Sequence, residues 1–216
     1  IELPKQWYDA SDCSVTVSHT TIECLTPWGI GGELTFFVEV GHQRSAQPND
    51  DEVDVAGLGM AYPGDTTFAS SSTEAKVSYT LALINSFSVN TVLRTTGSQL
   101  VAITGSNFGP TAATLAQENI SRVNNVSASY GPWGNEDRYS ATGCEVVVDD
   151  TGIMCGSVEG VGMDHHWMAF VGGEWSNRSV NVTQYAPPNI TGIYPLSGPT
   201  EGERTVITIS GQNFGL

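Results

Sequence analysis

The fold is decided by residues 101–109, VAITGSNFG, a stretch that returns as ITISGQNFG at residues 207–215. Each copy begins with apolar residues at alternate positions, the pattern of a half-buried β-strand. Each copy ends in Gly-x-Asn-Phe-Gly, and Gly and Asn at this spacing are typical of a tight turn. The two copies predict that one strand-and-turn unit occurs twice in the chain.

A second internal repeat has a different offset. Residues 8–45 align without a gap to residues 139–176. The matches are structural residue types at structural spacings, which a repeat explains best. They are Tyr8/Tyr139, Ala10/Ala141, Cys13/Cys144, Val15/Val146, Val17/Val148, Ile22/Ile153, Cys24/Cys155, Gly29/Gly160, Gly31/Gly162, Val40/Val171, Gly41/Gly172 and Ser45/Ser176.

The two offsets together predict the order of the domains. We expect residues 1–81 to be the C-terminal part of one domain, residues 82–187 a complete domain, and residues 188–216 the N-terminal part of a third. The first domain has an acidic insertion at about residues 46–76. Because the chain starts and stops inside a repeat, we expect it to be an excerpt from a longer protein.

Alternating apolar residues predict strands throughout the chain. Hairpins join residues 13–18 to 22–24 and residues 146–148 to 153–155, and Val15 and Val17 lie on one half-buried face. Further strands span residues 33–40 and 164–171, where His165 takes the core-facing position of Leu34. No stretch has a convincing helical period, and 24 Gly and 10 Pro punctuate the chain at short intervals. The pattern is typical of all-β, Ig-like sandwich domains.

The four cysteines, Cys13, Cys24, Cys144 and Cys155, form two pairs with identical spacing. Four cysteines allow three pairings, and the repeated spacing favours the local one within each hairpin. A zinc site would need shorter Cys-x2-4-Cys spacing and further ligands. Disulfides predict an oxidising compartment, such as the outside of a cell.

The charge of the chain is strongly acidic, with 23 acidic residues against 8 basic ones and a formal net charge of −15. Binding to DNA or to anionic membrane surfaces requires clustered Lys and Arg, so nucleic-acid partners are disfavoured. No apolar run approaches the length of a membrane-spanning helix, so we expect no membrane insertion by this segment.

Five Asn-x-Ser/Thr sequons support passage through the secretory pathway. Each one is a potential N-glycosylation site, although any one of them could be an ordinary surface asparagine. The five sequons together with the paired cysteines are stronger evidence for the secretory pathway than any single sequon. The sequon asparagines are Asn119, Asn125, Asn177, Asn181 and Asn189.

The sequence PPNITGIYPLSGP at residues 187–199, followed by Gly202 and the strand that ends at Gly215, resembles the opening of an IPT/TIG domain. This is the Ig-like fold shared by plexins and transcription factors. Residues 153–187 are similar to the closing part of the family, with Ile-x-Cys, Gly-x-Gly, a strand and Val-Gly-Gly-x-x-Ser before Tyr and Pro. Residues 84–89, INSFSV, depart from the pattern because they lack the proline seen at Pro195.

The resemblance implies tandem Ig-like modules of a large extracellular surface protein rather than a reaction. Modules of this family occur in surface receptors and adhesins, in large algal and protist surface proteins, beside the catalytic domain of some glycoside hydrolases, and in DNA-binding factors. Fold alone does not choose among these roles. Charge, sequons and disulfides favour the surface proteins over the DNA-binding factors.

Two groups of residues are candidates for metal binding. Asp50, Asp51, Glu52 and Asp54 could bind calcium through carboxylate oxygens, but they lack the order of an EF-hand and a solvated loop is the simpler interpretation. His165 and His166 are neighbours on a predicted strand, so they point to opposite faces and are poorly placed to share an ion.

Five aromatic residues could stack on sugar rings, although packing at domain junctions is the simpler interpretation. Trp167 is expected in the core and Trp133 in an exposed loop. No nucleophile elbow, phosphate loop or His-Glu-x-x-His motif is present, so we expect no enzyme, no cofactor and no catalytic residues. The aromatic residues are Trp28, Tyr130, Trp133, Trp167 and Trp175.

The sequence as a whole predicts a non-catalytic structural or adhesive segment of a secreted or cell-surface glycoprotein, as in an extracellular fibre or flagellar hair. Its expected partners are neighbouring domains of the same chain, N-linked glycans, and another protein or further copies of itself. Two alternatives are a carbohydrate-binding accessory module of a larger enzyme and a receptor ectodomain that binds a ligand.

Overall fold

The computed structural model describes residues 8–36, 38–45, 76–87, 91–117, 125–200 and 206–215. Two compact units make up the chain, residues 1–31 with 79–216 and residues 32–78. The acidic run at residues 50–54 and the sequon at Asn119 lie outside the described residues.

The Gly-x-Asn-Phe-Gly turn closes strand β9 (Leu100–Ser106). Asn107 has a φ of +62°, and its side-chain amide donates a hydrogen bond to the Leu81 carbonyl oxygen at 3.0 Å. Phe108 is fully buried, with its ring against Gly105, where an added Cβ would overlap both the ring and the Leu83 carbonyl oxygen. The motif therefore fixes the end of β9 to the strand beside it.

The second copy of the turn has the same geometry. Asn213 has a φ of +61° and donates to the Pro187 carbonyl oxygen at 3.0 Å. A Cβ at Gly211 would overlap the Phe214 ring and the Asn189 carbonyl oxygen. The equivalence predicted between the two stretches thus extends to backbone conformation and hydrogen bonding.

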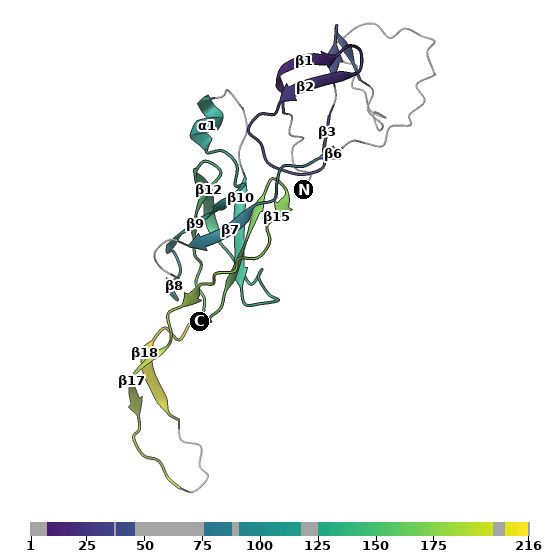
Figure 1. Cartoon of the computed structure of the whole chain (residues 1–216). Helices are drawn as coiled ribbons and strands as arrows, with labels where there is room; N and C mark the ends of the chain where they lie inside the picture. The colour runs from purple at the N-terminus through teal and green to yellow at the C-terminus, as the bar shows by residue number, and fades with distance from the viewer. Residues whose placement is uncertain are drawn as a thin grey trace, which may run out of the picture. The chain divides into compact units, whose positions relative to one another are not determined.

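Two antiparallel sheets form a sandwich from residues 83–185, which we call the central sandwich (Figure 1). The first sheet has the order β12-β13-β9-β7, and the second has the order β11-β10-β14-β15. Short strands β8 and β16 pair in parallel beside them. The remaining bounds are β7 Leu83–Phe87, β8 Val92–Leu93, β10 Val126–Gly131, β11 Tyr139–Ser140, β12 Thr142–Val148, β13 Gly152–Gly156, β14 His166–Val171, β15 Glu174–Trp175 and β16 Gln184–Tyr185.

Side chains at alternate positions of the strands fill the space between the two sheets. In β14, Trp167, Ala169 and Val171 are buried, and His165 just before the strand continues this face. Val101 and Ile103 of β9 pack into the same core cluster. The prediction of an all-β, Ig-like sandwich is confirmed, because each strand presents one apolar face to the opposite sheet.

The hairpin of β1 (Ser11–Val17) and β2 (Thr21–Leu25) pairs as the sequence predicts, but its exposure differs. Val15 was expected on a half-buried face and is 63% exposed. Its counterpart Val146, with Ile153 opposite, is buried because β9 and β7 extend that sheet and the second sheet covers it. No third strand pairs with β1 or β2 among the described residues.

A separate hairpin near the C-terminus pairs β17 (Asn189–Tyr194) with β18 (Thr208–Gln212). Its apolar residues Ile193 and Ile209 lie opposite each other in the register and are about half exposed. Two strands alone have one apolar face and no second layer to bury it.

The unit of residues 32–78 contains four two-residue strands where the sequence predicted one strand over 33–40. They are β3 (Leu34–Thr35), β4 (Glu39–Val40), β5 (Gln43–Arg44) and β6 (Lys76–Val77), and β3 pairs with β6 and β4 with β5. Phe36, Val38 and Val40 alternate with the core-facing position of Leu34 and were therefore expected on the same face, but they are exposed. The alternating pattern is present, but no covering layer lies over it in the described part of this unit.

One short helix, α1 (Ala112–Gln117), corrects the expectation that the chain has no helix. The Thr111 hydroxyl accepts a hydrogen bond from the Thr114 amide at 3.2 Å, and the Asp149 carboxylate accepts one from the Thr111 amide at 2.6 Å. Leu115 is the buried residue of the helix. Six residues are too few for a sequence periodicity, so capping and one apolar contact define the element. Among the described residues, no helix is long and apolar enough to cross a membrane.

Left-handed backbone conformations recur at equivalent positions of the sequence repeat. Gly31 and Gly162 have φ angles of +104° and +109°, and Gly41 and Gly172 have +59° and +61°. Non-glycine residues share the pattern, since Glu33 and its counterpart Asp164 have φ angles of +54° and +56°. Positive φ is unfavourable for residues with a side chain, so its recurrence indicates the same loop architecture. The further pairs are Asp12/Gly143, His19/Asp150, His42/Gly173 and Gly109/Gly215.

Substitution of Gly105 by Ala should destabilise the central sandwich by roughly 3 kcal/mol or more, because the added methyl group meets backbone and a buried ring. Urea unfolding followed by tryptophan fluorescence measures the loss. Gly192→Ala is the matched control, since the nearest atom to its new Cβ would be 3.9 Å away. Equal midpoints for the two variants would contradict the packing argument.

Candidate interaction surface

An exposed tryptophan lies at one end of the second sheet of the central sandwich. Trp133 is 71% exposed, in the loop between β10 and β11. The loop is held by the amide of Asn135, which donates to the Pro132 carbonyl oxygen at 2.9 Å, and Gly134 turns the chain with a φ of +80°. The tight turn presents the indole to solvent instead of to the core.

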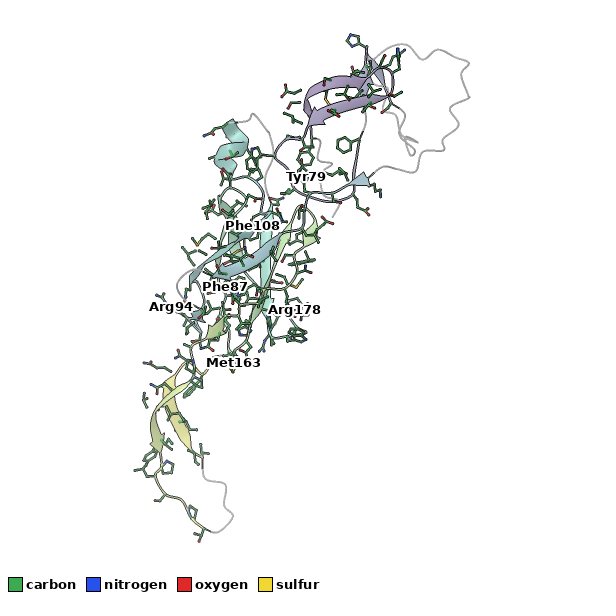
Figure 2. The ribbon with its side chains drawn as sticks, in the orientation of Figure 1. Tyr79, Phe87, Arg94, Phe108, Met163 and Arg178 are labelled. Atoms are coloured by element: carbon green, nitrogen blue, oxygen red, sulfur yellow. A yellow bond between two sulfur atoms is a disulfide. The ribbon has the colours of Figure 1, made fainter. Side chains whose placement is uncertain are left out.

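The indole is fixed by a charged neighbour from a different segment. The guanidinium of Arg178 lies over the Trp133 ring, 3.4 Å from its centroid, and donates to Glu136 Oε1 at 2.7 Å. Figure 2 labels Arg178 at the edge of the central sandwich. Hydrogen bonds from the Gly134 amide and from the backbone of Glu136 itself, together with Arg178, hold the pKa of Glu136 below its usual value. A planar cation on an aromatic face is attractive in itself.

His166 completes this surface, which we call the Trp133 surface and define as Trp133, Glu136, His166 and Arg178. The His166 ring meets the edge of the indole with ring centroids 5.6 Å apart. Its Nδ1 lies 2.7 Å from the Ser179 carbonyl oxygen, a hydrogen bond that orients the ring. An oriented, exposed aromatic ring with polar groups around it can bind a ligand.

Two serines hold the segment that carries Arg178 against β14. The Ala169 amide donates to the Ser176 hydroxyl at 2.9 Å, and the Trp167 amide donates to the Ser179 hydroxyl at 2.9 Å. Both serines are buried. Because these serines point inward, the two residues between them, Asn177 and Arg178, are both exposed.

Four of the five sequon asparagines fall within the described residues, and all four are exposed. Asn125 precedes β10, Asn177 and Asn181 lie between β15 and β16, and Asn189 begins β17. The Asn181 side-chain amide already donates to the Asn85 carbonyl oxygen at 2.7 Å. Glycosylation of these residues remains a prediction.

Both disulfides have the local pairing that the repeated spacing favoured. Cys13 bonds to Cys24, and Cys144 bonds to Cys155, with Cα atoms 4.1 Å apart in each pair. Each disulfide joins neighbouring strands at a break in the hairpin register. Cys155 is fully buried and belongs to the core, so the second disulfide ties β12 to the centre of the first sheet.

Replacing Cys144 and Cys155 by Ala should lower the free energy of unfolding of the central sandwich by about 2–3 kcal/mol, the value for closing a loop of this length. Urea unfolding with and without the disulfide measures the difference. The matched control is the pair Cys13→Ala and Cys24→Ala, which lies in the exposed hairpin and should leave the main transition unchanged. An equal loss from both pairs would contradict this assignment.

Three tyrosine hydroxyls fasten the Gly-rich loop at residues 156–162 to the central sandwich. The Tyr185 hydroxyl donates to the Val158 carbonyl oxygen at 2.7 Å, and the Val158 amide donates to the Tyr130 hydroxyl at 2.9 Å. The two hydroxyls are 2.7 Å apart, so Tyr130 must donate to Tyr185. Tyr139 bonds both backbone groups of Val161 in the same way. Burial raises the pKa of Tyr130 and of Tyr185, which keeps both hydroxyls available as donors.

Tyrosine hydroxyls form the same kind of hydrogen bonds to the backbone of the loop at residues 26–31. The Tyr8 hydroxyl donates to the Ile30 carbonyl oxygen at 2.7 Å and accepts from the Ile30 amide at 3.0 Å. The Tyr79 hydroxyl donates to the Pro27 carbonyl oxygen at 2.9 Å. Gly29 and Gly160 each lie against a tyrosine ring, that of Tyr79 or Tyr185, where a Cβ would overlap it. A Gly-rich loop thus has its polar groups satisfied by aromatic side chains.

His165 is buried beside these tyrosines, on the core face that its alignment with Leu34 predicted. The imidazole meets Tyr139 and Tyr185 edge-on, with ring centroids 5.5 Å and 5.4 Å apart. Neither ring nitrogen has a hydrogen-bond partner. Burial, and next the charge of Arg138, lower the pKa of His165. No group of three or more His, Cys, Asp or Glu residues is placed to hold a metal ion in the described ranges.

The pKa of His165 predicts that acid destabilises the central sandwich. The unfolded chain takes up a proton near pH 6.5, whereas the buried ring stays neutral to lower pH. Stability should therefore be constant above pH 6.5 and should fall as the pH drops below it. Chemical denaturation between pH 7.5 and 5.5 measures the slope.

His165→Leu, which installs the residue found at position 34, should remove most of this slope and raise stability at pH 5.5. His166→Leu is the control for losing an imidazole at the next position, on the outer face of the strand. Identical slopes in wild type and His165→Leu would assign the acid sensitivity to other groups.

The remaining tryptophans divide between core and surface. Trp167 is fully buried and stacks on Tyr130 with ring centroids 4.2 Å apart, while its Nε1 donates to the Thr183 hydroxyl at 2.9 Å. Trp175 is half exposed and packs against Phe170. Trp133 lies in an exposed loop, as the sequence predicts, with its ring turned to solvent after β10 and Arg178 over one face.

Trp28 is half exposed and lines a cleft of about 360 Å3 within the larger unit. Residues 26–31 and 79–82 form one wall of this cleft, and Asn107, Asp150, Val171 and Glu174 form the other. Ile30 belongs to the same buried cluster as the core of the central sandwich. A Cβ at Gly172 would overlap the backbone of Gly31, so only glycine permits this approach.

Sequence reasoning missed Glu136, Arg178 and the role of His166. An isolated tryptophan in a Gly-Pro-Trp-Gly turn was visible, but the other three residues of the surface are 3, 33 and 45 residues away from it in the sequence. Only the pairing of β10 with β14 brings these segments together.

Comparison with protein-family models places an IPT/TIG domain at residues 188–216. This match confirms the resemblance for the last stretch of the chain and agrees with a non-enzymatic Ig-like domain. Comparison with curated proteins and with solved structures found no match.

Proposed function

We propose that the chain is a non-catalytic structural or adhesive segment of a large secreted or cell-surface glycoprotein. Successive IPT/TIG-like domains, at residues 1–81, 82–187 and 188–216, would make it a building block of an extracellular fibre or flagellar hair. The observation that carries this proposal is the recurrence of the same loop geometry at residues 26–31 and 157–162.

The contacts around these loops support a connection that repeats along the chain. Ile30 is buried in the core cluster that includes β9 and β14. Its counterpart Val161 lies against Gly215, where an added Cβ would overlap the valine side chain. The Thr95 hydroxyl lies 3.4 Å from Asn213 Oδ1 across the same link. Repeated contacts of this kind give a chain of modules with limited freedom between neighbours.

The two disulfides and the exposed sequons support an extracellular location. Disulfides persist in oxidising compartments, and N-glycosylation takes place in the secretory pathway. The net charge of −15 supports a soluble chain that repels nucleic acid and anionic lipid. Its expected partners remain neighbouring domains, N-linked glycans and either another protein or further copies of itself.

Gly172→Ala should loosen the link between residues 26–31 and the central sandwich, because the new methyl group overlaps the Gly31 backbone. Amide hydrogen exchange in residues 26–31 should accelerate by about tenfold, which corresponds to about 1.4 kcal/mol. Gly143→Ala, in β12 of the central sandwich, is the matched control, since its φ is the same within 4° but nothing lies within 4 Å of the new Cβ. Equal exchange in both variants would show that strain at positive φ, and not the contact, causes the effect.

Negative-stain electron microscopy of the intact parent protein tests the structural role directly. Regular fibres with an axial repeat are expected. Single molecules, together with hydrolase or transferase activity that maps to this segment, would overturn the proposal.

A carbohydrate-binding accessory module is a second candidate, favoured by one observation. Trp28 and Trp133 are both exposed, whereas burial of both would have counted against it. Titration of soluble oligosaccharides into unglycosylated chain, followed by the Trp133 indole NMR signal, separates this function from the structural one. Saturable shifts that disappear in Trp133→Ala would favour it.

A further inference from the structure

Trp133 is held in one orientation although it contributes nothing to the core. Its indole is 71% exposed with Arg178 on one face and His166 at one edge. An exposure this large leaves the opposite face of the ring open to solvent. An exposed aromatic ring held rigid loses little conformational entropy when something packs on it.

The nearest candidate occupant is set by the neighbour of Arg178 in the sequence. Arg178 is the middle residue of the sequon Asn177-Arg178-Ser179. Buried Ser176 and Ser179 direct Asn177 and Arg178 to solvent together. Consecutive Cα atoms are about 3.8 Å apart, so a glycan on Asn177 starts beside the residue that covers Trp133.

We propose that the open face of the Trp133 indole is the docking platform for the first sugars of an N-glycan on Asn177. This inference rests on the proposed passage of the chain through the secretory pathway. In the modification, the Asn177 side-chain nitrogen forms a bond to C1 of N-acetylglucosamine. The diphosphate of a lipid-linked oligosaccharide donor leaves with the bonding electrons, and the nitrogen loses one proton.

The chemistry of the Trp133 surface suits a pyranose ring. The C–H face of the sugar is apolar and packs on the open face of the indole, while its hydroxyl and acetamido groups stay in contact with water. Arg178 and Glu136 hold the ring from the other face. A peptide ligand would need an extended apolar groove, whereas Trp133 is the only large apolar residue in this surface.

The other sequons are less well placed for this contact. The Asn181 amide is already bonded to the Asn85 carbonyl oxygen. Asn125 precedes β10 and Trp133 follows it, so the six residues of the strand separate them by about 20 Å. Asn125 therefore provides a matched control at the far end of β10.

Oxidative footprinting of residues 1–216, produced in a eukaryotic secretory host, tests the proposal. Mass spectrometry gives occupancy of each sequon and the oxidation rate of Trp133, normalised to the exposed Met163. We expect the Trp133 rate to be at least threefold lower in the glycosylated chain than in Asn177→Gln. Trimming the glycan to a single N-acetylglucosamine should keep most of the protection, and Asn125→Gln should keep all of it.

Arg178→Gln keeps the sequon but removes the planar cation beneath the indole, so protection should fall below twofold at unchanged occupancy. This variant distinguishes docking of the glycan on an indole fixed by Arg178 from non-specific shielding of Trp133 by a bulky glycan. Full protection in Arg178→Gln would overturn the role of the Trp133 surface.

The possible failures are distinguishable. An occupied Asn177 with an unchanged Trp133 rate, or an empty Asn177 beside other occupied sequons, would overturn this inference and leave the glycoprotein proposal intact. A secreted chain with no sequon occupied would overturn both. Added N,N′-diacetylchitobiose could also lower the Trp133 oxidation rate of the unglycosylated chain as much as the Asn177 glycan does. That result would show that the indole binds the sugar of another molecule, and it would overturn the assignment to Asn177.

Discussion

The hydrogen bonds from tyrosine hydroxyls to the Gly-rich loops are the constraint on which the rest of the structure depends. A loop without side chains cannot bury its own backbone groups at low cost. Tyr130 and Tyr185 satisfy both polar groups of Val158 and complete each other's hydrogen bonding. The loop is thereby fixed against the end of the sandwich.

A second feature of the structure is a close approach between two loop backbones. Where Gly172 approaches the Gly31 backbone, two loops come closer than any side chain would permit. Contact through the backbone depends on conformation more than on side-chain identity. Left-handed φ angles recur at equivalent positions of the repeat even where the residue is Glu33, Asp164 or His19.

The loops at the other end of the second sheet show a different use of the same sandwich. There the strands β10 and β14 deliver Trp133 and His166 to one place, and the segment after β15 adds Arg178. Charge, aromatic stacking and a fixed turn hold the ring without burying it. The Trp133 surface and the close approach at Gly172 thus occupy separate loops of one sandwich.

The sequence by itself determined the all-β class, the strand-and-turn unit ending at Gly109, the local cysteine pairing and the core position of His165. These follow from period-two alternation and from spacing that repeats, both of which are local properties of the chain. Exposure of Val15, the split of residues 33–40 into short strands, and the helix at residues 112–117 were decided by which layers and caps surround them. The Trp133 surface was decided by tertiary structure alone, because its members lie on separate loops and only strand pairing brings them together.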